Sequence, residues 1–198
     1  MISTKQLIKE FTQENGVMTS RQVNELGLSS RQIKKLVNDQ IISKIKQGYY
    51  QMVNDFVEDQ IIISKLYPKA VIFLESALLH YEYTDRIPRE WQIAVNKNEE
   101  KSKYNIDFPS IKPFYIKPEF LDIGLSTFLL NHQIIRIYNR DRTICDVLRY
   151  ENKLEKEVVT QSIKNYLNDP KKNISQFIEY ANIFNIREKA ENRIGMWL

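Results

Sequence analysis

The sequence predicts an α+β protein in which a small helical module with one hairpin precedes a mixed α+β domain that ends in a helical bundle. Three observations predict this arrangement. Helix-start patterns recur three times before residue 40, β-rich runs fill the middle of the chain, and apolar stripes with helical spacing follow Tyr138. Because the strands of the second part precede most of its helices, an α+β domain is favoured over an alternating parallel sheet.

The first three helices each begin at a hydroxyl residue that stands three positions before a glutamine. In such a capping box, the hydroxyl and the amide satisfy free backbone N–H groups reciprocally. The pairs are Ser3 and Gln6, Thr19 and Gln22, and Ser29 and Gln32. The expected helices run to about Glu14 with Leu7, Ile8 and Phe11 inward, from about Ser20 to Leu26, and over residues 29–40.

The third of these helices keeps its apolar and its basic residues on opposite faces. At about 100° per residue, Ile33, Leu36 and Val37 fall together and predict a core-facing side. The opposite side carries four polar residues at spacing i, i+3, i+4, i+7, which are Arg31, Lys34, Lys35 and Asn38. This side favours negative charge and hydrogen-bonding partners.

Residues 42–52 predict a β-hairpin that turns at Gln47-Gly48, because glycine takes the positive φ that tight turns require. Helices followed by such a hairpin are typical of a winged helix-turn-helix module, in which the second helix of the pair enters the major groove of DNA. The basic side of the third helix is therefore expected to contact DNA. Lys44 and Lys46 on the hairpin are expected to reach the flanking backbone or the minor groove. The alternative interpretation is a solvated helix face.

The net positive charge of the chain lies in the region where the DNA contact is expected. Residues 1–52 hold 8 Lys and Arg against 4 Asp and Glu, whereas residues 53–198 hold 21 of each, so the net charge of +4 lies in the first quarter of the chain. Such asymmetry favours a polyanionic partner. We expect a DNA-binding domain over residues 1–52, a linker at 53–56, and a C-terminal domain over 57–198.

Composition also restricts the class of protein. The longest apolar run has five residues, over 70–74, and the charged N-terminus lacks the core of a signal peptide, so we expect a cytoplasmic protein without a membrane-spanning helix. The single cysteine, Cys145, forms no internal disulfide, and two distant histidines do not suggest zinc. We expect no metal and no cofactor.

The C-terminal domain is expected to begin with a helix over 56–68 that offers Phe56, Ile61, Ile62 and Leu66 for packing. A β-like run and a helix from about Glu75 follow, then strands at 91–95 and 114–116, and a hairpin over 125–139 that turns at Asn131-His132. The last helices are expected to be capped at Asp141 or Thr143, to cover 154–167, to open at Asn173, and to run from Arg187 to the C-terminus.

The C-terminal domain carries no recognisable catalytic motif. Glycine-rich phosphate loops and a GxSxG elbow are absent from the sequence. The densest acidic pair, Asp141 and Asp146, lies beside Arg142 and Arg149, which favours a solvated or capping ion-pair cluster over catalysis. We expect no enzymatic activity and no catalytic residue.

Several stretches resemble one known family. They are SKIKQGYYQM at the hairpin, ESALLHYEYTDRIPREWQIAV, and above all IRIYNRDRTICDVLRY. In this order they resemble the AbiEi family, the antitoxins of type IV (AbiE) toxin–antitoxin systems from bacterial abortive infection. The resemblance covers nearly the whole chain and is least between about Lys97 and Phe120.

The resemblance implies an N-terminal winged helix joined to an antitoxin domain. It implies a protein that represses its own operon at inverted repeats in double-stranded promoter DNA, and that neutralises a nucleotidyltransferase-like toxin without a stable complex. The DNA role falls on Arg31, Lys34, Lys35, Lys44 and Lys46. The antitoxin role falls on the segment from Arg140 to Tyr150, with Arg140, Asp141, Arg142, Thr143, Asp146 and Arg149 as its candidate residues.

Two other functions stay open at this point. One is a one-component transcription regulator whose C-terminal domain senses a ligand, which a pocket with convergent polar groups would favour. The other is an enzyme fused to a DNA-binding module, which a metal or clustered carboxylates would favour. Because no heptad run predicts a permanent dimer, we expect a monomer in solution that pairs only on DNA.

Overall fold

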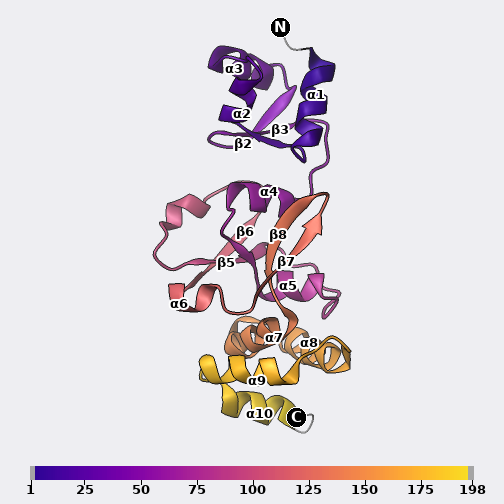
Figure 1. Ribbon diagram of the computed structural model, residues 1–198, viewed down its shortest axis with the longest axis vertical. Coiled ribbons are helices and arrows are strands. Elements are labelled where there is room, and N and C mark those ends of the chain that lie inside the picture. Colours follow the sequence, from indigo (N-terminus) through magenta and orange to yellow (C-terminus); the bar gives the residue numbers. More distant parts are fainter. Residues whose placement is uncertain (1–2, 196–198) are drawn as a thin grey trace. The chain divides into compact units, whose positions relative to one another are not determined.

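The computed structural model describes residues 3–195 and has a mixed α+β fold, as the sequence predicts (Figure 1). The described chain divides into two compact units. The first comprises the chain up to Pro68 together with residues 105–110 and 129–135, and the second comprises residues 69–104, 111–128 and 136 onward. That residues 57–198 fold as an independent domain stays a prediction.

The N-terminal module contains short helices and short strands in the order α1-β1-α2-α3-β2-β3. Its helices are α1 (Thr4–Gln13), α2 (Ser20–Glu25) and α3 (Ser30–Asn38), and its strands are β1 (Val17–Thr19), β2 (Ile42–Lys46) and β3 (Tyr49–Met52). The strands form an antiparallel sheet in the order β1-β3-β2, with Val17 opposite Gln51. The sequence analysis predicts the β2–β3 hairpin but misses β1, which adds a third strand to it.

Two capping boxes hold the second and third helices, as predicted. The hydroxyl of Thr19 accepts from the N–H of Gln22 and that of Ser29 from the N–H of Gln32, and each glutamine side chain accepts from its cap in return. At Ser3 the hydroxyl accepts from the N–H of Gln6. The core of the module contains Leu7, Phe11, Met18, Val23, Leu28, Ile33, Ile42 and Met52.

Two apolar residues of this region do not pack as expected. Ile8 is 46 % exposed, because α1 buries only the side that carries Leu7 and Phe11. Phe56 is 83 % exposed and precedes α4 (Asp59–Leu66), whereas the neighbouring Val57 is buried. The predicted helix over 56–68 is therefore shorter, although Ile61, Ile62 and Leu66 are buried as expected.

The segment after the expected linker contacts the N-terminal module. A Cβ placed on Gly16 would lie 2.3 Å from Cγ2 of Val57, so the two residues touch across the end of α1. The ammonium group of Lys65 donates to Glu14 at 3.1 Å. Residues 57–68 thus belong to the first compact unit, and a cut at 53–56 would remove these contacts.

The second sheet is mixed and has the strand order β6-β5-β4-β8-β7. Its strands are β4 (Val71–Ile72), β5 (Trp91–Asn96), β6 (Ile111–Ile116), β7 (Leu125–Leu130) and β8 (Gln133–Tyr138). Strand β4 pairs antiparallel with β5 and parallel with β8, and β5 pairs parallel with β6. Asn131 and His132 both have positive φ, as expected for the turn between β7 and β8.

Helices fill the connections of this sheet and the end of the chain. The connections carry α5 (Leu74–His80), α6 (Pro118–Leu121) and a 3-10 turn at Lys101–Tyr104. The C-terminal helices, which lie against one another in Figure 1, are α7 (Arg140–Arg149), α8 (Lys156–Asn168), α9 (Ile174–Ile183) and α10 (Arg187–Ile194), with a 3-10 turn at Glu151–Lys153. Helix α7 contacts α5, α8, α9 and α10, so it forms the centre of the bundle.

The starts and ends of these helices differ from expectation at three places. The cap of α7 is Asn139, whose side chain accepts from the N–H of Arg142, and not Asp141 or Thr143. Leu154 precedes α8 instead of opening it, because Glu155 is its N-cap. The predicted last helix covers Arg187–Ile194 and ends with Gly195 as its C-cap, and residues 196–198 of that prediction lie outside the described residues.

Two glycines provide a matched test of the contact at Val57. Gly16 and Gly27 have φ of +81° and +84°, but a Cβ on Gly27 would meet nothing within 4 Å. We expect Gly27→Ala to cost about 1–2 kcal/mol of unfolding free energy through backbone strain alone. Gly16→Ala should cost at least about 1 kcal/mol more, because it also collides with Val57. Urea unfolding measures both.

The additional variant Val57→Ala removes the colliding methyl groups, so it should recover part of the loss in Gly16→Ala and none in Gly27→Ala. Equal costs for the two glycine substitutions would mean that residues 57–68 do not pack on the N-terminal module in solution.

Candidate functional site

The predicted basic face of α3 is present and accessible. Arg31, Lys34, Lys35 and Asn38 are all exposed, whereas Ile33 on the opposite side is 4 % exposed. Among the described residues, none of these three cations pairs with a carboxylate. No carboxylate of residues 3–195 therefore neutralises their charge. The Ser29 capping box fixes the start of the helix and so the direction in which this face points.

The two hairpin lysines differ in their surroundings. Lys44 is exposed, and its ammonium group donates to the side-chain oxygen of Gln47 at 2.6 Å. Lys46 is half-buried, donates to the Tyr67 hydroxyl at 3.2 Å, and lies 4.9 Å from the centre of that ring. Burial, with the nearby Tyr49, raises the pKa of Tyr67 to about 12, so this hydroxyl stays neutral. Lys44 is accordingly the more available of the two.

The candidate residues on α7 lie mostly in the interior. Ion pairs form around Asp146, which accepts from Arg142 at 2.7 Å and from Arg149 at 2.6 Å. The expectation of a solvated cluster is wrong, because the side chains of Arg142 and Asp146 are 0 % exposed. An unpaired charge there would be costly, so each of these groups needs the other.

Arg142 connects three parts of the second unit. One of its terminal nitrogens donates to the carbonyl oxygens of Phe120 and Ile123, at 3.0 and 2.7 Å. Its guanidinium carbon lies 4.2 Å from the ring centres of both Tyr138 and Phe184. The nitrogen Nη2 has no hydrogen-bond partner among the described residues, and the two aromatic faces offset part of that loss.

The other residues of the segment also make internal contacts. A carboxylate oxygen of Asp141 accepts from the Tyr166 hydroxyl at 2.8 Å and from the N–H of Asn173 at 2.7 Å. Thr143 donates to the carbonyl of Tyr138. Cys145 is fully buried, and burial raises the pKa of its thiol. Of the six candidates, Arg140 and Arg149 keep the most side-chain exposure, at 31 and 19 %.

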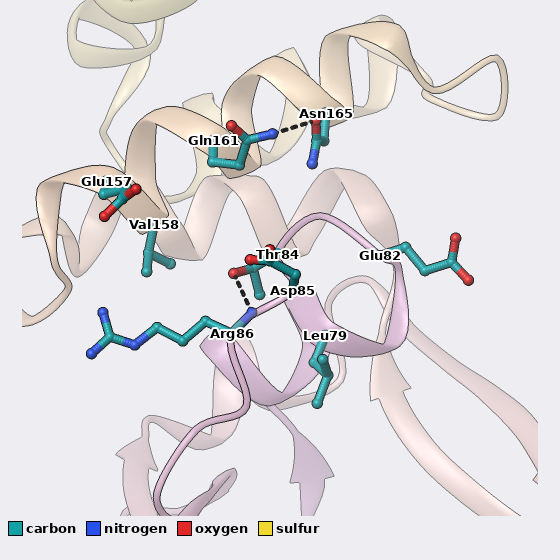
Figure 2. A pocket seen from close by; sticks show the side chains of 9 residues that line it. All are labelled: Leu79, Glu82, Thr84, Asp85, Arg86, Glu157, Val158, Gln161 and Asn165. Atoms are coloured by element: carbon teal, nitrogen blue, oxygen red, sulfur yellow. Dashed lines mark hydrogen bonds between the residues drawn. The ribbon is translucent and has the colours of Figure 1, made fainter.

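The second unit contains two hollows, of which only the second is lined by a residue of this segment, Arg140. The first, of about 920 Å³, lies between the loop after α5 and the helix α8 (Figure 2). Glu82, Asp85 and Glu157 contribute acidic groups to it, and the guanidinium of Arg86 is bound by Glu155 at its rim. Within the described residues, no three His, Cys, Asp or Glu side chains gather as a metal site.

The second hollow, of about 560 Å³, has a different character. His80 and Tyr81 at the end of α5, Arg140 at the start of α7, and Lys171 after α8 all line it. The Nε of Arg140 donates to Asp169 at 2.8 Å, and its guanidinium lies 4.6 Å from the centre of the Tyr81 ring. The sequence analysis named Arg140 but not its partners, because no local pattern brings residues 80–83 and 165–171 together.

Comparison with family models and with curated proteins returned no match for this chain. No helix over residues 3–195 has both the length and the apolar character that crossing a bilayer requires.

Two ion pairs with the same spacing test whether the α7 cluster is structural. Arg142–Asp146 and Arg187–Glu191 are both i,i+4 pairs joined through the arginine Nε, at 2.7 and 2.8 Å, but the second pair is 56 and 52 % exposed. Asp146→Ala should cost about 3–5 kcal/mol of unfolding free energy, because it leaves Arg142 buried without a counter-charge. Glu191→Ala should cost less than about 0.5 kcal/mol.

Chemical denaturation of the two variants measures this difference. Similar small losses for both would show that water enters around Asp146 and that the cluster is not a buried structural element.

Proposed function

We propose that this protein is a DNA-binding autorepressor and antitoxin of the type IV kind, with a winged helix-turn-helix at its N-terminus and no catalytic activity of its own. The observation that carries the DNA-binding part is the basic face of α3, which is exposed and unpaired within the described residues. Because phosphate contacts dominate protein–DNA affinity, three unneutralised cations on one helix face are suited to that task.

The order of elements supports the winged helix-turn-helix assignment. Helices α2 and α3 are joined by residues 26–29, which include Gly27 with φ of +84°, and the hairpin β2–β3 follows directly. In this assignment, α3 is the recognition helix and the hairpin is the wing. Asn38 offers the amide that suits a base edge, whereas Arg31, Lys34 and Lys35 suit phosphates or guanine.

The antitoxin part of the proposal rests on the resemblance to the AbiEi family. The segment IRIYNRDRTICDVLRY carries that resemblance most strongly. Most of its polar residues are bonded inside the second unit, so we propose that the segment maintains the domain and that any contact with a toxin uses residues around it. Neutralisation without a stable complex agrees with a segment that offers little exposed surface.

The ligand-sensing regulator is the second candidate, and one observation favours it. The hollow beside Arg140 contains convergent polar groups, which is the feature expected of a ligand pocket in such a regulator. A regulator of this kind would use the same α3 face on DNA, so the two candidates differ only in the role of the second unit. Co-expression with the neighbouring gene, which the antitoxin proposal expects to encode a nucleotidyltransferase-like toxin, separates them, since only an antitoxin restores growth.

The triple substitution Arg31→Ala, Lys34→Ala and Lys35→Ala should weaken binding to the promoter of the protein's own operon. Each lost phosphate contact should lower the slope of log affinity against log salt by about 0.9. A matched control replaces Lys5, Lys9 and Arg21, which are exposed in the same module but off this face. Fluorescence anisotropy at several salt concentrations measures both.

The control changes net charge equally, so it should lose much less affinity and keep most of the salt slope. If the two triple variants lose equal affinity, the α3 face contributes only its share of the general positive charge and is not a specific contact. If the α3 triple variant binds the promoter as tightly as the unmodified protein, the α3 face is a solvated helix face and does not contact DNA.

The α3 triple variant should still rescue growth when it is co-expressed with the toxin. The substituted residues lie in the first unit, and Ile33, Leu36 and Val37 are unchanged, so the second unit should be unaffected. Growth is measured at fixed toxin expression and matched antitoxin level. Loss of rescue by the folded variant would contradict the separation of the two roles.

The proposed repressor acts as two copies on inverted repeats, from a monomer in solution. Sedimentation velocity at low micromolar concentration should give a monomer alone and two copies on a promoter duplex. A tight dimer without DNA would contradict this mode of assembly.

A further inference from the structure

We propose that the hollow lined by His80, Tyr81, Arg140 and Lys171 is a binding site for a small organic anion, which the guanidinium of Arg140 holds through its carboxylate or phosphate group. The site lies wholly in the second unit and goes beyond the proposed antitoxin function. It does not depend on DNA binding by α3.

The guanidinium of Arg140 is fixed in direction before any ligand arrives. Its Nε donates to Asp169 at 2.8 Å, and its plane lies over the Tyr81 ring, 4.6 Å from the ring centre. Tyr81 is itself held, because its hydroxyl donates to the carbonyl of Tyr138 at 2.7 Å. A pre-oriented arginine loses little side-chain entropy when it binds a ligand.

The terminal nitrogens of Arg140 remain available. The described residues provide a hydrogen bond only to its Nε, and its side chain is 31 % exposed. Its two terminal amino groups, with four N–H donors, therefore have no hydrogen-bond partner among the described residues, and Arg140 lines the hollow. This planar fork fits the two oxygens of a carboxylate or a phosphate.

Asp169 does not compete for a ligand's cationic groups, because its oxygens are already occupied. One oxygen accepts from the Tyr83 hydroxyl at 2.6 Å as well as from Arg140, and the other accepts from the N–H of Lys171 at 2.7 Å. Burial would raise the pKa of Asp169, but these hydrogen bonds together lower it below the usual value. Asp169 therefore serves to position Arg140.

The remaining walls favour an organic anion over a bare ion. The volume of about 560 Å³ is that of a small-molecule site. Lys171 is exposed at the rim and adds a second positive charge. His80 stacks on Phe128 at 4.0 Å between ring centres, and burial, with Arg140 nearby, lowers its pKa, so it is a neutral ring at pH 7. The one exposed acid on the rim is Glu82, which disfavours highly charged ligands.

The test follows the side-chain signal of Arg140 Nε and the amide signal of Lys171 by NMR during titration of the full chain at constant ionic strength. The probes are inorganic phosphate, ribose 5-phosphate and succinate, with chloride as the reference salt. We expect saturable shifts of both signals with at least one organic anion, and weaker binding of inorganic phosphate because it reaches no ring. A preference for ribose 5-phosphate or for succinate identifies the phosphate or the carboxylate as the recognised group.

Three variants make the result specific. Arg140→Lys keeps the charge but removes the fork, so affinity should fall at least about tenfold, the effect of one lost charge-assisted hydrogen bond. Arg187→Lys changes an arginine whose Nε bonds a carboxylate in the same way, at 2.8 Å, outside the hollow, and should have no effect. Lys171→Gln alters only an exposed side chain, so it should weaken binding without loss of folding.

Absence of saturable shifts with all three probes would overturn the proposal. So would unchanged affinity in folded Arg140→Lys and Lys171→Gln. If instead a promoter duplex shifts the same two signals and displaces the bound anion, Arg140 is a DNA-backbone contact and the small-ligand site is rejected.

Discussion

The buried guanidinium of Arg142 is the constraint on which most of the second unit depends. It joins the connection before β7 through the carbonyls of Phe120 and Ile123, the end of β8 through the ring of Tyr138, and the helical bundle through Phe184. Gly124 is required beside it, since a Cβ there would lie 2.6 Å from Cβ of Arg142. Asp146 supplies the counter-charge that makes this burial possible, and Arg149 completes it. The sheet, the loop before β7 and the helical bundle therefore all contact the guanidinium of Arg142. Substitutions in the segment around Arg142 should be poorly tolerated because of packing alone.

The chain contains two kinds of charged residue, which differ in whether they are buried in ion pairs or exposed. On α7, Arg142 and Asp146 are paired and buried, so they stabilise the fold of the second unit. On α3, charges are exposed and unpaired within residues 3–195, so they are available to a partner. Arg140 is intermediate, because one edge of its guanidinium is fixed by Asp169 and the other faces a hollow. Exposure, more than charge itself, distinguishes the residues that we propose to bind a partner from those that stabilise the fold.

The parts of the fold that depend on local sequence were predictable. The boxes at Thr19 and Ser29, the turn at Gly48, and the opposed faces of α3 involve residues within a few positions of one another. Strand β1 was not predicted, because its three residues become a strand only by pairing with β3, thirty or more positions away. The stretch RDRT, residues 140–143, suggests a solvated cluster for the same reason. Its burial depends on contacts with residues near 120 and 184, which no local pattern indicates. The site at Arg140 needs three distant segments to meet, so only its arginine could be named in advance.

We propose that the α3 face and the hairpin bind DNA while the second unit does not. Backbone amide NMR of the full chain with a duplex of its own promoter, at physiological salt, tests this most directly. We expect saturable shifts concentrated in residues 29–48, with the amides of the second unit left unchanged. Shifts confined to the second unit, or shifts of residues 29–48 that an unrelated small polyanion of the same charge reproduces in full, would contradict this division.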